Sequence, residues 1–411
     1  MDATYRAITE DEHAAVADLI LHLGFGGPTP GEEYLRIAPA GQFRVLAAEH
    51  GEPLSALRVG RLAQWWLGRR VPSAQVLHLA TPPQHRGQGW GTRLLAGLLA
   101  ELREAGVPTV SLRPSNLPFY RAAGFEVAGA WSLYEARCEH LPGRLGGFRA
   151  RQVPLDDLAE PSAVYERVAP SRHGAFARDD LSWRWIATRG RERAAVCFVL
   201  DRPDGLADPA KGPPGGPAGW VVVGFDAQRG APVPATYLQV LDWGCEPGAD
   251  TALFALLAGY GPMGGVVRWS GPDPDPALFA LPDQHARLTS RFHWMLRVVD
   301  VQRAFEARPY PEGATGRIAL EVDDPVCPWN TGTWRLELAG GAARVERSPG
   351  GEGGEQSAAL ATVRGLAPLF TGFTDPADLV RAGLLALPRP ADLEFLRAAF
   401  ASPRPWTAEV Y

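Results

Sequence analysis

The chain has 411 residues, which is enough for two or three domains that each bury a core of their own. Its net charge of −5 provides no broad basic field, so we expect no nucleic-acid partner. No apolar run approaches the roughly 20 residues that cross a bilayer, and the first residues lack the basic and apolar regions of a signal peptide. We therefore expect a cytoplasmic protein that has no membrane partner.

The four cysteines are scattered along the chain without a close pair. This spacing indicates neither a disulfide framework nor a zinc site, so we expect no metal. We expect them instead to be small buried apolar residues. They are Cys138, Cys197, Cys245 and Cys327.

The first informative segment is a glycine-rich run at residues 86–91, between an apolar strand-like segment at 74–81 and an apolar helix-like segment at 92–104. Glycines allow backbone N–H groups to approach an anion closely, and the start of a helix offers unpaired N–H groups and the positive end of its dipole. The run therefore predicts a site for a phosphate-bearing ligand.

Two common nucleotide-binding loops do not fit this run. The Walker loop needs a lysine after its last glycine, and Gly91 is followed by Thr92. The dinucleotide fingerprint spaces its glycines differently from Gly87, Gly89 and Gly91. What remains is the pattern Arg-x-x-Gly-x-Gly at the start of a helix.

A second motif follows a strand-like segment at residues 109–112. Residues 115–125 read Ser-Asn-Leu-Pro-Phe-Tyr-Arg-Ala-Ala-Gly-Phe. Together with Arg86, Gly89 and Gly91, this segment resembles two ordered motifs of the GCN5-related N-acetyltransferase (GNAT) superfamily. The resemblance implies acetyl-coenzyme A (acetyl-CoA) as the co-substrate and a small-molecule amine as the acceptor.

Residues 294–310 and 327–336 carry a narrower resemblance, to the Eis (enhanced intracellular survival) family of GNAT enzymes. It spans nearly the whole chain and implies an α+β (mixed α/β) fold with three domains. These are an active GNAT domain at residues 1–145, a degenerate GNAT-like domain at 146–305, and a domain at 306–411 that resembles sterol carrier proteins. The resemblance also implies a homo-oligomer, a hexamer.

The middle domain lacks the phosphate-binding pattern at the matching place. Its strand-like segment at residues 235–242 is followed by Gly-Cys-Glu-Pro-Gly at 244–248, and no Arg-x-x-Gly-x-Gly follows. We therefore expect only the first domain to bind the coenzyme.

Acetyl transfer needs an amine beside the thioester, donors for the oxyanion and a proton for the leaving thiolate. The resemblance assigns the general acid to Tyr120 and the general base to the terminal carboxylate of Tyr411. It places the coenzyme on Leu79, Ala80, Thr81, Arg86, Gly87, Gln88, Gly89, Trp90, Gly91, Thr92, Ser115 and Asn116.

Other acidic and basic residues compete for roles near the acceptor. His78 has a side chain suited to proton transfer, although a single histidine in a strand is more often a hydrogen-bonded core residue. Glu409 could hold a cationic acceptor. Glu32 and Glu33 could line an acceptor pocket beside Phe25 and Tyr34, or could be solvated residues on a helix.

The sequence thus predicts an N-acetyltransferase that acts on a cationic acceptor, such as an aminoglycoside, a polyamine or a lysine amine. One alternative is a protein acetyltransferase or an enzyme that transfers longer acyl chains. Another is a carrier of hydrophobic ligands with a vestigial first domain, but the intact loop at Arg86 and the presence of Tyr120 argue against it.

Overall fold

The structure, a computed structural model, describes residues 2–24, 32–203, 215–227, 236–261, 265–348 and 358–409. Its first two units share one twelve-stranded sheet, in the order β1-β2-β3-β6-β7-β14-β8-β13-β12-β11-β10-β9. The strands of the first unit are β1 Ala3–Ala7, β2 Phe43–Ala48, β3 Pro53–Gly60, β6 Ser73–Ala80, β7 Thr109–Leu112 and β8 Glu126–Arg137. Those of the second are β9 Arg149–Val153, β10 Val196–Asp201, β11 Pro217–Ala227, β12 Thr236–Cys245, β13 Val266–Gly271 and β14 Arg287–Val298.

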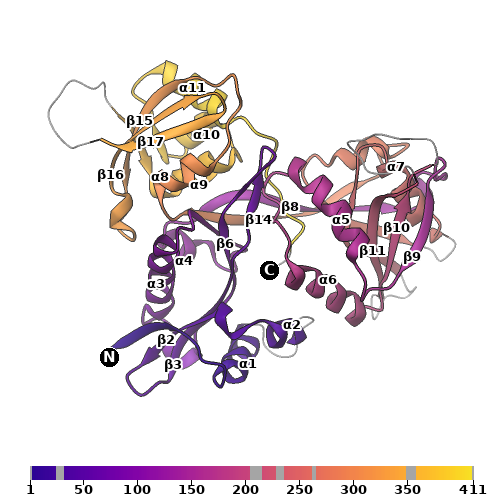
Figure 1. The fold of residues 1–411 in the computed structure, drawn as a ribbon, viewed down its shortest axis with the longest axis horizontal. Helices are drawn as coiled ribbons and strands as arrows, with labels where there is room; N and C mark the ends of the chain where they lie inside the picture. The colour runs from indigo at the N-terminus through magenta and orange to yellow at the C-terminus, as the bar shows by residue number, and fades with distance from the viewer. Residues whose placement is uncertain are drawn as a thin grey trace.

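The two units exchange strands at the centre of this sheet. β14, from the second unit, lies between β7 and β8 of the first, and β8 in turn pairs with β13. Both long strands cross the middle of the molecule in Figure 1. Gly129 on β8 allows the crossing to be tight, because a Cβ there would lie 2.2 Å from the ring of Trp294 on β14.

Each unit repeats a parallel strand pair joined by a helix. In the first unit, α3 Trp90–Glu104 connects β6 to the parallel β7, and in the second, α7 Asp250–Ala258 connects β12 to the parallel β13. The strand β12 extends to Cys245, beyond the segment expected from the sequence, because its ladder with β11 continues to that residue. The other helices of the two units are α1 His13–Gly24, α2 Glu32–Ile37, α4 Leu117–Ala122, α5 Ala159–Val168 and α6 Asp180–Glu192.

The helix α3 packs on the sheet through the apolar face that its sequence predicts. Leu94, Leu98 and Leu102 are all fully buried. In its last turn, Glu101 accepts hydrogen bonds from the Tyr5 hydroxyl on β1, at 2.6 Å, and from Arg44 on β2, at 2.6 Å. These contacts fix the helix that begins at the glycine-rich loop.

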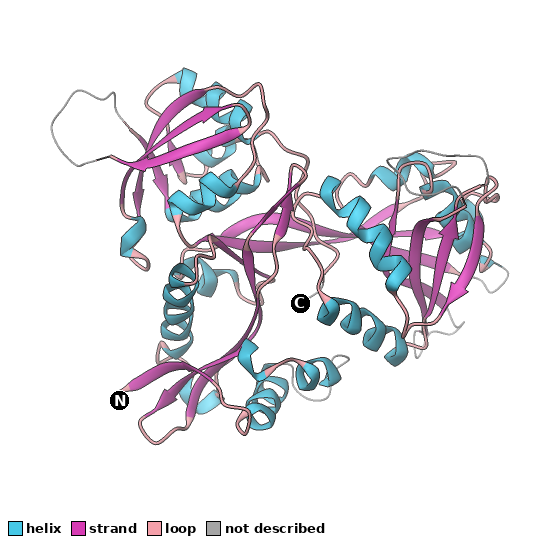
Figure 2. Ribbon diagram, in the orientation of Figure 1, coloured by secondary structure: helices cyan, strands magenta, loops and turns pink. Residues whose placement is uncertain are grey.

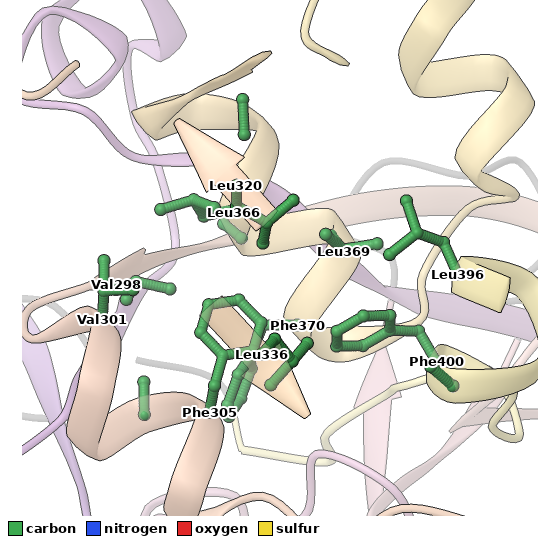
Figure 3. Packing of buried hydrophobic residues seen from close by; sticks show 14 of the residues in the cluster. Val298, Val301, Phe305, Leu320, Leu336, Leu366, Leu369, Phe370, Leu396 and Phe400 are labelled. Carbon is green, nitrogen blue, oxygen red and sulfur yellow. The ribbon is translucent and has the colours of Figure 1, made fainter. Parts of the chain in front are cut away.

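The third unit has a separate five-stranded sheet in the order β17-β16-β15-β18-β19. Helices cover this sheet, as Figure 2 shows. The rings of Phe305, Phe370 and Phe400 pack together in its core, with centroids about 6 Å apart (Figure 3). The elements are α8 Val301–Ala307, β15 Gly316–Asp323, β16 Gly332–Ala339, β17 Ala342–Arg347, β18 Ala359–Thr362, α9 Val363–Thr371, α10 Pro376–Arg381, β19 Leu385–Ala386 and α11 Pro390–Phe400.

A buried ion pair joins the third unit to the shared sheet. Arg297 on β14 and Asp324, just after β15, are both fully buried, and their closest nitrogen and oxygen atoms are 2.6 Å apart. Asn330 donates a further hydrogen bond to Asp324, at 3.0 Å. Because a buried charge is costly without its partner, this pair holds the two sheets in one relative position.

All four cysteines are free thiols, and three of them are buried, while Cys245 is partly buried. None of the helices in the described ranges combines the length and the apolar character needed to span a bilayer.

We predict that Asp324→Ala lowers the free energy of unfolding by about 3 to 5 kcal/mol, because it leaves Arg297 buried without a counter-charge. Denaturant unfolding of the full chain measures this. As a control, Glu394→Ala removes an exposed carboxylate on α11 and is expected to cost less than about 1 kcal/mol. Equal unfolding midpoints for the two variants would contradict the prediction.

Candidate active site

The strands β6 and β7 separate partway along their length. They pair in parallel from Ser73 to Val76, whereas β3 pairs with the other edge of β6 as far as Ala80. Among the described strands, none pairs with Leu77–Ala80 on the side of β7. Since backbone N–H and C=O groups require partners, this open edge is suited to an extended ligand with amide groups. Leu79, Ala80 and Thr81 lie at its end.

The loop that follows has the conformation of an anion cradle. Gly87 and Gly89 have φ angles of +76° and +80°, in the left-handed region that residues with a Cβ rarely adopt. No atom lies within 4 Å of a Cβ built at either glycine, so the space in front of both is open. The first turn of α3 contains no acidic residue, which leaves the positive end of its dipole available for an anion.

The rest of the loop is tied down by its own side chains. Arg86 donates from Nε to the carbonyl oxygen of Thr81, at 3.1 Å, and Gln88 accepts from the Trp90 ring nitrogen, at 3.2 Å. Trp90 is buried, whereas residues 86–89 and Thr92 are exposed. The loop is therefore anchored at both ends and accessible between them.

The helix α4 brings the second sequence motif to this loop. A Cβ at Gly91 would lie 3.1 Å from Cζ of Phe119, closer than most Cβ contacts, so the glycine favours the close approach of α4. Asn116 caps α4 by accepting a hydrogen bond from the backbone N–H of Phe119, at 3.3 Å. Tyr120 follows Phe119 on the same helix, so the two motifs predicted from the sequence lie side by side.

Tyr120 is suited to donate a proton at neutral pH. Its side chain is only 6% exposed, and burial raises its pKa to about 12, while a hydrogen bond with Ser115 acts weakly in the other direction. The hydroxyl group is therefore protonated throughout the physiological pH range. A general acid must carry its proton before the reaction, and Tyr120 meets that condition.

The matching connection in the second unit, which lies within the described residues, differs from this loop. Only residues 246–249 connect β12 to α7, against residues 81–89 in the first unit. Asp250 stands in the first turn of α7, where it opposes an anion. The carboxylate of Glu246 is buried and pairs with Arg167, at 2.6 Å, and with Arg202. A carboxylate therefore already neutralises the cations near this helix start.

A cavity of about 340 Å³ lies between the first two units. Leu21 on α1 and Leu35 on α2 line one side, and α6 lines the other; these helices face each other in Figure 1. β6 contributes Leu77 and His78, the first two residues of the open edge. The cavity and the open edge thus share one strand.

The segment at residues 406–409 reaches this cavity. Trp406 forms a bridge with Ala130 on β8, and its backbone N–H donates to His173, at 2.8 Å. Ala408 and Glu409 then line the cavity wall. Tyr411, the predicted base, lies outside the described residues.

A buried arginine holds this tail in place. Arg178, just before α6, pairs with Glu409 at 2.8 Å and with Asp242 on β12 at 2.7 Å. Its guanidinium lies 4.0 Å from the ring centroid of Tyr165 and 4.8 Å from that of Trp183. Sequence reasoning missed Arg178 and Asp242, since no local pattern marks an ion pair between distant segments.

The remaining candidates have limited support as bases. Burial and the guanidinium of Arg58 lower the pKa of His78 to about 3, so its imidazole is neutral but a weak base. Phe25 lies outside the described residues, as do the side chains of Glu32, Glu33 and Tyr34 on α2.

Comparison with known proteins places two domain families on the chain. Residues 4–128 match the acetyltransferase (GNAT) domain family, and residues 301–408 match the sterol carrier protein domain family. Among relatives, an uncharacterized N-acetyltransferase of Streptomyces griseus is 29% identical over 100% of both chains. The N-acetyltransferase Eis of Mycobacterium tuberculosis is 26% identical over 82% of this chain and 79% of its own.

The fold is shared with known structures as well. A GCN5-related N-acetyltransferase from Kribbella flavida has a TM-score of 0.81 and 26% identity, over 100% of this chain and 98% of that one. The predicted fold class, two tandem GNAT-like domains followed by a sterol-carrier-protein-like domain, is confirmed.

We predict that Gly89→Ala weakens acetyl-CoA binding by about tenfold. A residue with a Cβ in the left-handed region costs about 1 to 2 kcal/mol of conformational free energy, and the loop can avoid this cost only by moving its N–H groups. Calorimetric titration with acetyl-CoA measures this. Gly51→Ala is the matched control, since Gly51 has a φ of +86° and equally open surroundings in the turn between β2 and β3. If both variants kept the affinity of the parent chain, the loop would not be the binding site.

Proposed function

We propose that this chain, which has a GNAT domain and a sterol carrier protein domain and is similar to the Eis N-acetyltransferases, transfers the acetyl group of acetyl-CoA to an amine bound in the cavity between its first two units. The observation that carries this proposal is the juxtaposition of the loop at Arg86–Gly91, the open edge of β6 and the protonated Tyr120.

In the proposed reaction, backbone N–H groups of the loop at residues 87–92 bind the pyrophosphate. Main-chain groups of Leu79, Ala80 and Thr81 bind the pantetheine and polarise the thioester carbonyl. The amine nitrogen attacks the carbonyl carbon, a C–N bond forms and the C–S bond breaks. Tyr120 donates its proton to the leaving sulfur, and the base accepts a proton from the amine.

For the base we retain the terminal carboxylate of Tyr411. The position of Ala408 and Glu409 in the cavity wall supports this choice, because Tyr411 follows Glu409 by two residues in the sequence. Glu409 itself is paired with Arg178, and His78 has a pKa of about 3, so neither is as well suited to accept a proton.

Other features of the proposal rest on the resemblance to the Eis family. They are a cationic acceptor such as an aminoglycoside, a hexameric assembly and a cytoplasmic location. Transfer to protein amines or of longer acyl chains is the second hypothesis for the same site. The third hypothesis, a carrier of hydrophobic ligands, gains no support from the third unit. There, Phe305, Phe370 and Phe400 pack on one another in the core.

We predict that Tyr120→Phe lowers kcat by about 10² to 10⁴, because the thiolate then leaves without its proton donor. The KM for acetyl-CoA is expected to change little, since the ring remains in place against Phe119 and Phe125. Release of coenzyme A measures both parameters. The control is Tyr134→Phe, which removes a buried hydroxyl on β8 that bonds to Pro272. An unchanged kcat in Tyr120→Phe would rule out this acid.

A separate prediction concerns the base. Deletion of Tyr411 is expected to lower kcat by about 10², because the terminal carboxylate is displaced by one residue. Tyr411→Phe keeps that carboxylate and is expected to stay within about twofold of the parent kcat. If the phenol rather than the carboxylate were needed, Tyr411→Phe would lose as much activity as the deletion, and the proposed base would be wrong.

A further inference from the structure

The charged side chains that the structure describes in the wall of the cavity do not favour a polycation. Among the described residues that line it, arginines outnumber carboxylates. The arginines are Arg58, Arg61, Arg178, Arg189 and Arg193, and the carboxylates are Asp179, Asp242 and Glu409.

Each of the three carboxylates already has a structural partner. Asp242 and Glu409 both bind the guanidinium of Arg178, at 2.7 and 2.8 Å. Asp179 caps α6 by accepting a hydrogen bond from the backbone N–H of Ser182, at 2.8 Å. A cationic ligand would therefore have to compete with bonds that hold the fold together.

Three of the five arginines are also engaged. Arg178 is neutralised as described, and Arg61 pairs with Glu101, at 2.6 Å. Arg58 donates two hydrogen bonds to the side-chain oxygen of Gln42, at 2.8 and 3.0 Å.

Arg189 and Arg193 differ from the other three. They stand on consecutive turns at the end of α6, where like charges four residues apart repel each other. Neither side chain forms an ion pair or a hydrogen bond with any residue that the structure describes, and Nε of Arg193 is buried. Burial, followed by the charge of Arg193, lowers the pKa of Arg189 to about 10, while the carboxylates of Asp242 and Glu192 act in the other direction. Both side chains are half-buried, and a charged donor that loses water without gaining a partner is costly, so this end of α6 is suited to an anionic group of a ligand.

The rest of the wall is largely apolar. α6 contributes Leu181, Trp185 and Ile186, and Phe176 and Leu241 lie beside them. An aromatic or aliphatic body fits these side chains better than a hydroxylated sugar, because it buries apolar surface without leaving hydroxyl groups unpaired.

We propose that the acceptor is a small amino carboxylate with an apolar body, whose carboxylate binds Arg189 and Arg193 while its amine points toward the open edge of β6. This inference rests on the proposed acetyl transfer, and it replaces the cationic acceptor that the family resemblance implies with an amino carboxylate. The bonds that form and break are those of that reaction, and the products are the N-acetylated amino carboxylate and free coenzyme A.

The test is a calorimetric titration of the full chain, saturated with coenzyme A, with three amines: phenylalanine, phenylalaninamide and spermidine. Phenylalanine is expected to bind about ten- to a hundredfold more tightly than its amide, the range for a charge-assisted hydrogen bond. Arg189→Gln and Arg193→Gln should each remove this preference. Arg184→Gln is the matched control, since Arg184 is an exposed residue of α6 that does not line the cavity.

Turnover is followed separately, by release of coenzyme A from acetyl-CoA with the same amines. If the parent chain binds spermidine or the amide as well as phenylalanine, or binds none of them, the inference is overturned, whatever the turnover. If phenylalanine binds in a manner that depends on Arg189 but no amine releases coenzyme A, the acceptor class stands and the proposed function fails.

Discussion

The exchange of β8 and β14 is the constraint on which the rest of the structure depends. Met295 on β14 pairs with Leu112 on one side and with Val127 on the other, so a strand of the second unit completes the sheet of the first. Because the two sheets are continuous, α1 and α2 of one unit face α6 of the other at a fixed separation. The continuous sheet therefore determines how far apart the walls of the cavity lie, and a loose interface between domains does not.

Within this frame, Arg178 organises the acceptor side. A fully buried guanidinium is tolerated because two carboxylates and two aromatic rings surround it. The same bonds tie β12 and the end of the chain to the start of α6. They also have an electrostatic consequence, since Asp242 and Glu409 are counter-charges of Arg178 and form no ion pair with Arg189 or Arg193.

The sequence predicted what is local in the structure. The loop, the apolar face of α3 and the motif that ends at Tyr120 occupy one continuous stretch, so their residue types and spacing carried enough information. The strand exchange was not predictable from the sequence, because the residues of β14 have the pattern of an ordinary strand. The tertiary fold determines which strands pair with it. Glu409 and Arg178 stand 231 residues apart, a separation at which no spacing rule applies. Arg189 and Arg193 lie at the polar end of a helix, where the sequence pattern is typical of a solvent-exposed face.

This difference separates the two halves of the site. The donor half is made from residues 73–120 alone, so its glycines and its tyrosine are enough to identify it. The acceptor half needs α1 and α2, α6, β12 and the tail to meet, and each comes from a different part of the chain. A substitution in α6 can therefore change the charge that the proposed acceptor encounters without touching a residue that we propose to hold the coenzyme. The acceptor class must accordingly be argued from the paired and unpaired charges of this particular cavity, since a shared coenzyme loop says nothing about them.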